Sequence, residues 1–119
     1  MRRDMDLIRD MLLTTGDAPA PVDARTFVDD AHDWDTVVYN LDMIRQANLA
    51  EIRFGRTALG VVRATVGPLT WAGNEYVDAI RDNNVWKKVK RTLAQTVGGA
   101  TLDTVKALAV KITTDMLMN

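Results

Sequence analysis

Within residues 34–66 the spacing of apolar side chains changes from that of a helix to that of a strand. This change constrains the fold more than any other feature. Residues 34–48 are predicted to form an α-helix that Asp33 caps, with Asp35 in its positive first turn. Its apolar side chains follow the spacing i, i+3, i+4, i+7 and i+10, in the order Trp34, Val37, Val38, Leu41 and Ile44. Residues 50–66 then alternate apolar and polar side chains, which predicts a β-hairpin with its turn at Gly55-Arg56-Thr57, closed by Gly67-Pro68.

Residues 3–14 predict another helix before this segment. A connector containing two prolines and a glycine follows, and a short strand is predicted within residues 24–30. The order helix, connector, helix and hairpin is that of a winged helix-turn-helix domain. Residues 34–48 would then be the recognition helix, and residues 50–66 the wing.

Additional helices are predicted over residues 70–118, with Thr70 and Thr101 as N-caps and an interruption at residues 81–84. Trp71 and Trp86 are predicted to anchor two helical segments in the core, and Gly73 to allow another element to approach closely. Trp86 shares an apolar stripe with Val89, Leu93 and Val97. The expected fold is mainly α with a small β-hairpin, in one domain of 119 residues.

Composition excludes several functional classes. The chain has no cysteine and a single histidine, which leaves little for disulfides, thiol catalysis or metal binding. A net charge of −1 does not fit a strongly basic nucleic-acid binder. Apolar runs are too short to cross a membrane, and acids stand near the start where a secretion signal would be apolar. We therefore expect a soluble cytoplasmic protein.

Three blocks of the sequence carry a family resemblance: MRRDMDLIRDML at residues 1–12, VVYNLDMIRQANLAEI at 37–52 and LTWAGNEYVDAIRDNNVWKKVK at 69–90. These blocks resemble a family of small winged-helix-like proteins of unknown function that is common in bacteriophages and prophages. The resemblance implies a winged-helix-like fold and a phage origin, and hence a bacterial host. It implies no particular activity.

Candidate catalytic and metal sites are weak. The acidic run DDAHDWD around His32 lacks the spacing and the glycine of a calcium loop, so a solvated helix entry is the favoured interpretation. Thr70 and Glu75 are not paired with a base of suitable pKa. We therefore expect no enzyme activity, no cofactor and no metal.

The outward face of helix 34–48 is the strongest candidate for partner binding, with six residues predicted to point away from the core: Asp35, Thr36, Tyr39, Asp42, Met43 and Gln46. Aspartates repel DNA phosphates, whereas tyrosine and methionine are enriched at protein interfaces. This face favours a protein partner, such as a host defence or regulatory factor.

Sequence-specific DNA binding is the alternative function. The wing offers Arg53, Arg56 and Arg63, and residues 83–91 offer Lys87, Lys88 and Arg91, as phosphate contacts. These last three cations point largely away from the stripe that contains Trp86, which also fits a solvated helix face. The apolar face of the last helix is a further candidate, either for homodimerisation or for folding back on the chain.

Overall fold

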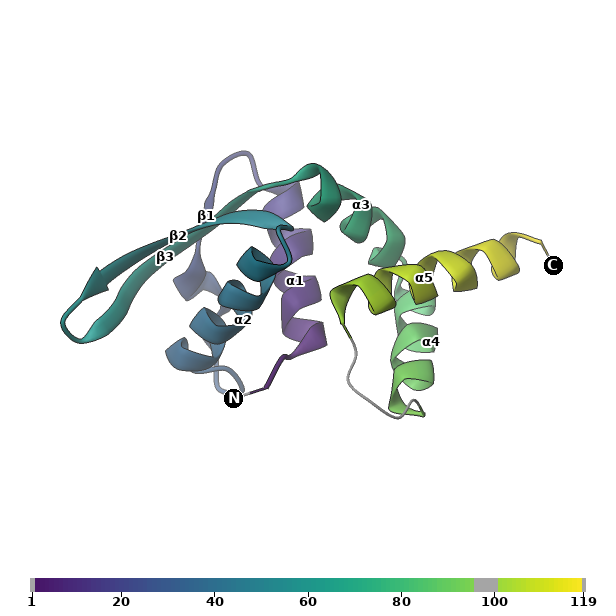
Figure 1. Cartoon of the computed structure of the whole chain (residues 1–119), viewed down its shortest axis with the longest axis horizontal. Helices are drawn as coiled ribbons and strands as arrows, with labels where there is room; N and C mark the ends of the chain where they lie inside the picture. Colours follow the sequence, from purple (N-terminus) through teal and green to yellow (C-terminus); the bar gives the residue numbers. More distant parts are fainter. Residues whose placement is uncertain (1, 96–100, 119) are drawn as a thin grey trace. The chain divides into compact units, whose positions relative to one another are not determined.

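The computed structural model describes residues 2–95 and 101–118, and it is mainly helical with a small three-stranded antiparallel sheet (Figure 1). The chain divides into two compact units, Met1–Asn74 and Glu75–Asn119. Helix α3, Trp71–Ile80, contains the boundary between them. None of the helices in the described ranges has both the length and the hydrophobicity of a membrane span.

Two capped helices supply much of the core of the first unit. Helix α1, Met5–Asp17, begins at Asp4 and buries Leu7, Ile8, Met11 and Leu12. Helix α2, Trp34–Gln46, begins at Asp33, whose carboxylate accepts a hydrogen bond from the Thr36 N–H at 2.8 Å. Both predicted helices are confirmed, because caps and apolar spacing act within one or two turns.

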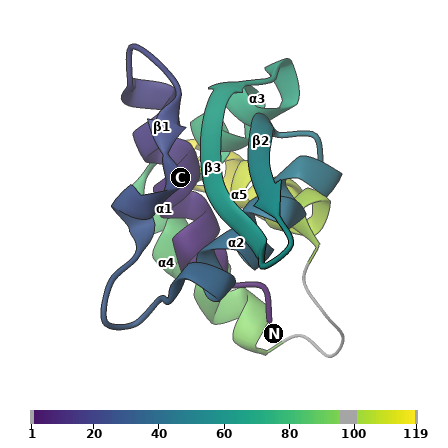
Figure 2. The ribbon, with the colours of Figure 1, turned by 90° about the vertical axis from the view of Figure 1, so that its left-hand side faces the viewer.

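The sheet contains β1 (Val22–Asp23), β2 (Ala50–Thr57) and β3 (Gly60–Leu69), in the order β1-β3-β2, as Figure 2 shows. The predicted hairpin is confirmed, but its predicted turn is wrong. Gly55 pairs with Arg63 inside the ladder, and the chain reverses at Ala58 and Leu59 instead. Gly60 takes a φ of 106° directly after this two-residue loop, a conformation that glycine adopts without a steric penalty.

Two further local predictions need correction. The segment predicted as a strand within residues 24–30 instead begins with a 3₁₀-helix, η1, Ala24–Phe27. Asp23 caps it by accepting a hydrogen bond from the Arg25 N–H, so the extended chain of β1 ends there. Gly67-Pro68 does not close the hairpin, because β3 continues through both residues to Leu69.

Helix α3 begins against the turn that follows α2. The Thr70 hydroxyl donates to the Asn48 carbonyl at 2.6 Å and accepts from the Gly73 N–H at 3.0 Å. A Cβ placed on Gly73 would lie 1.8 Å from the Leu49 carbonyl oxygen. The predicted cap at Thr70 and the predicted close approach at Gly73 are both confirmed.

The second unit includes α4 (Asn83–Ala94) and α5 (Leu102–Leu117), which pack against each other. Asp82 and Thr101 cap them. Trp86 is buried, as predicted, and Lys87, Lys88 and Arg91 are exposed. Val97, predicted to extend the Trp86 stripe, lies outside the described residues.

Trp71 is 83% exposed, so its predicted role as a core anchor is wrong. The buried positions of α3 are Gly73, Tyr76, Val77 and Ile80. This spacing sets the phase of the helix and places Trp71 on the opposite side, since each residue turns the helix by about 100°.

Candidate functional site

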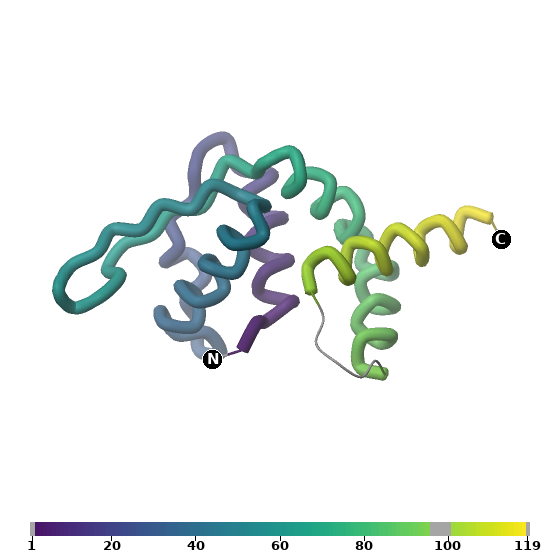
Figure 3. The backbone as a smooth tube through the Cα atoms, viewed as in Figure 1, coloured from purple at the N-terminus to yellow at the C-terminus, as the bar shows by residue number. Residues whose placement is uncertain are grey.

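A groove of about 480 Å³ lies between α2 and the β2–β3 hairpin. Helix α2 lines it with Asp35, Val38, Tyr39, Asp42 and Arg45, and the hairpin contributes Phe54, Arg56, Leu59, Gly60 and Val61. Figure 3 shows the hairpin as an arm whose turn lies beyond α2. Three residues of the predicted α2 face, Asp35, Tyr39 and Asp42, therefore line one concave surface together with the hairpin.

The other three residues of the predicted face lie outside the groove lining. Thr36 helps to build the helix, since its N–H bonds to Asp33 and its carbonyl accepts from the Asn40 amide. Met43 is half-buried, and Gln46 is exposed.

Contacts distant in sequence hold the hairpin against the start of α2. The Trp34 Nε1–H donates to the Val61 carbonyl at 2.8 Å, and the Arg25 guanidinium stacks over the Trp34 ring at 4.2 Å. Arg25 also donates to the Val62 carbonyl at 3.2 Å. The groove walls are therefore braced, a role for Arg25 and Trp34 that sequence reasoning missed. A stacked arginine next to a tryptophan has no signature at fixed sequence spacing.

Asp42 is the electrostatic centre of the α2 wall. Its carboxylate accepts from Arg45 Nε at 2.8 Å and from Gln46 Nε2 at 2.9 Å. The pKa of the Asp42 carboxyl is lowered, chiefly by the hydrogen bond from Arg45, and the Gln46 bond and the charge of Arg56 act in the same direction. Asp42 thus stays charged, and the polar ends of Arg45 and Gln46 are engaged within the helix.

The three wing arginines lie on two different faces of the sheet. Phe54 pairs with Ala64 and lines the groove, and Arg56 lies over its ring at 5.4 Å. Arg53 pairs with Thr65, and Gly55 pairs with Arg63. Because side chains alternate along a strand, Arg53 and Arg63 share the face opposite Phe54.

An ion-pair cluster centres on His32, which the sequence suggested only as part of an acidic run. His32 Nε2 lies 3.0 Å from Asp4 Oδ2, and Nδ1 lies 2.9 Å from Asp29 Oδ1. The pKa of His32 is raised, chiefly by the hydrogen bond to Asp4, with Asp29 adding to the effect. In the part of the chain that the structure describes, no cluster of His, Cys, Asp or Glu is arranged to hold a metal ion.

Comparisons with known proteins place the chain in a family without a described activity. The family described as "Hypothetical protein (DUF2513)" matches residues 2–100. An uncharacterized protein of Haemophilus influenzae is 31% identical over 120 residues, an alignment that covers 98% of this chain and 99% of that protein. No solved structure matches the chain. The chain therefore belongs to the DUF2513 family.

Proposed function

We propose that the first unit is a winged-helix domain and that it acts by binding another protein, without catalysing a reaction. The order α1, β1, η1, α2, β2, β3 and the pairing of β1 with β3 support the winged-helix assignment. In this assignment α2 is the recognition helix, and the β2–β3 hairpin is the wing.

The composition of the groove carries the proposal of a protein partner. Tyr39 and Phe54 line it with aromatic rings, and Leu59 at the hairpin turn is 94% exposed. Exposed apolar side chains beside an aromatic groove are typical of protein-binding surfaces. Of the charged residues that line the groove, Arg45 is paired with Asp42 and Arg56 lies over the Phe54 ring. The Asp35 carboxylate is therefore the charge that favours a partner segment combining an apolar side chain with a lysine or arginine.

The hydrogen bonds that Arg45 and Gln46 donate to Asp42 argue against base reading by α2. Gln46 is the side chain of the predicted α2 face best suited to bidentate hydrogen bonding with a base edge, and its amide donates to Asp42. Asp35 and Asp42 would meet phosphate oxygens as like charges. We therefore favour a host protein as the partner. The resemblance of the three sequence blocks supports a phage or other mobile element as the source of the gene.

Pull-down from a bacterial lysate, with quantitative mass spectrometry, tests this proposal. The variants Asp35→Lys and Tyr39→Ala are expected to lose the partners that the unchanged protein retains. Asp30→Lys makes the same charge change at an exposed residue outside the groove lining, and it is expected to retain them. Retention of every partner by folded Asp35→Lys and Tyr39→Ala proteins would reject the groove as the binding surface.

DNA binding is a second candidate because Arg53 and Arg63 are exposed neighbours on one face of the sheet. A gel-shift series against the region upstream of the gene would then show sequence preference. It would also show a log affinity that falls with log salt, with a gentler slope for Arg53→Gln. Equal affinity for random duplex at moderate salt would exclude this function.

A further inference from the structure

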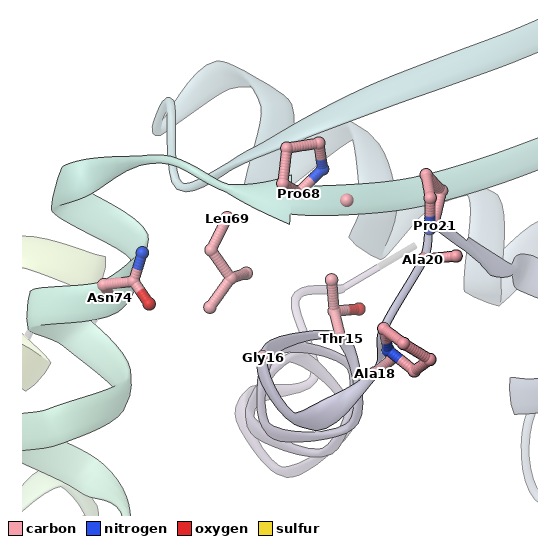
Figure 4. A pocket seen from close by; sticks show the side chains of 10 residues that line it. Thr15, Gly16, Ala18, Ala20, Pro21, Pro68, Leu69 and Asn74 are labelled. Atoms are coloured by element: carbon pink, nitrogen blue, oxygen red, sulfur yellow. The ribbon is translucent and has the colours of Figure 1, made fainter.

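A second cavity of about 350 Å³ lies in the first unit, away from the α2 groove. It is lined by the C-terminal end of α1, the following connector, the end of β3 and the start of α3 (Figure 4). Three of its ten lining residues are prolines, Pro19 and Pro21 from the connector and Pro68 from β3. No charged side chain occurs among the described residues that line it.

The Thr15 hydroxyl is the unusual group in this cavity. Thr15 is 6% exposed, and its Oγ1 has no hydrogen-bond partner among the described residues. A buried hydroxyl without a partner is costly, and such a group calls for an explanation. Figure 4 shows its oxygen turned toward residues 18–21 of the connector, inside the ring of lining residues.

Glycine at position 67 allows this arrangement. Its φ is 120°, and a Cβ there would lie 2.9 Å from Thr15 Cγ2 and 3.5 Å from the Pro21 Cα. The chain thus brings α1, the connector and β3 together without filling the space between them. Asn74 supplies a second polar group to the lining, and its Nδ2 already donates to the Thr70 carbonyl at 3.1 Å.

The geometry points to this cavity as a binding site for a small uncharged molecule that carries a carboxamide-like group. Ring faces and methyl groups in the walls suit a flat apolar body, and the Thr15 hydroxyl suits a carbonyl acceptor. An anion is disfavoured, because the lining offers no cation to offset its desolvation. The site is separate from the α2 groove and does not depend on the proposed protein partner.

Benzamide and benzoate form a matched pair of probes, with the same ring and nearly the same shape but different charge. Titration of the full chain to about 20 mM, followed by ¹⁵N–¹H amide shifts, suits the weak binding of a fragment of this size. Benzamide is expected to shift the amides of Gly16 and Gly67 in a saturable way, and benzoate is expected to leave them unchanged.

Three variants separate a built site from a packing defect. Thr15→Val keeps the shape and removes the hydroxyl, so it is expected to abolish the benzamide shifts and to raise the melting temperature of the free protein. Thr15→Ser keeps the hydroxyl and is expected to keep binding. Thr26→Val makes the same exchange at an exposed residue of η1, outside the lining, and is expected to change neither measurement. Equal benzamide shifts in the Thr15→Val protein, or no saturable shift in the unchanged protein, would overturn the proposal.

Discussion

Replacing Gly73 by alanine tests whether the close approach of α3 to the Asn48-Leu49 turn holds the first unit together. The added Cβ would lie 1.8 Å from the Leu49 carbonyl oxygen and 2.8 Å from its carbon. An ordinary C···O contact is about 3.3 Å or more, so the two segments must separate by about 1.5 Å. The added Cβ would meet only backbone atoms of Leu49, so no side-chain rotation can relieve the overlap.

The expected cost follows from the contacts that this movement breaks. Thr70 makes two hydrogen bonds to the turn, one from its N–H to the Leu49 carbonyl at 3.0 Å and one from its hydroxyl to Asn48 at 2.6 Å. Their loss costs about 1 kcal/mol each, and overpacking adds about 1 to 3 kcal/mol. The higher helix propensity of alanine offsets about 1 kcal/mol of this loss. We expect Gly73→Ala to lower the free energy of unfolding by about 2 to 4 kcal/mol.

Urea unfolding followed by far-UV circular dichroism measures this change. With a slope of about 1 to 3 kcal/mol per molar urea, the midpoint is expected to fall by roughly 1 M or more. Gly16→Ala in α1 is the matched control, because its Cβ would meet only the Leu69 Cδ1 methyl, at 3.1 Å. The same gain in helix propensity applies to this control, so it is expected to be as stable as the unchanged protein or up to about 1 kcal/mol more stable. Equal midpoints for the two variants would show that the Gly73 position tolerates a side chain as well as the Gly16 position does.

Three further predictions concern other parts of the molecule. Because the pKa of His32 is raised in the folded state, its ion pairs stabilise fully below its unfolded pKa, and this stability is lost as the pH rises through the folded value. The melting temperature should therefore fall more between pH 6 and pH 8 in the unchanged protein than in His32→Gln, and parallel pH curves would contradict this. Trp34→Phe removes the 2.8 Å bond to the Val61 carbonyl and should cost about 1 kcal/mol. It should also speed hydrogen exchange in the hairpin, and unchanged exchange would show that Trp34 does not brace it. Leu117 and Met118 are 82% and 79% exposed, so if α5 mediates homodimerisation, serine at both positions should convert a dimer to a monomer by light scattering. A monomeric mass for the unchanged protein at every concentration would exclude self-association.

Features that depend on neighbours within a few residues were predictable from the amino-acid sequence. Asp33, Thr70 and Thr101 cap helices because each side chain accepts a hydrogen bond from the N–H three positions later. The apolar period likewise predicted α1, α2, α4 and α5, and the strand alternation predicted the hairpin. The resemblance of the three sequence blocks pointed to a family of uncharacterized proteins, in agreement with the comparisons.

Features that depend on strand register and on contacts between distant residues were not predictable from local sequence patterns. Because Gly55 pairs with Arg63, the hairpin turn lies further along the chain than predicted, and Arg53 and Arg63 lie on the face away from the groove. Trp34 and Arg25 donate hydrogen bonds to hairpin carbonyls 27 and 37 residues further along the chain, so no local sequence pattern predicts the braced groove. The exposure of Trp71 also depends on tertiary contacts. The side of α3 that faces the core is set by which of its residues are buried, and burial is a property of the assembled fold.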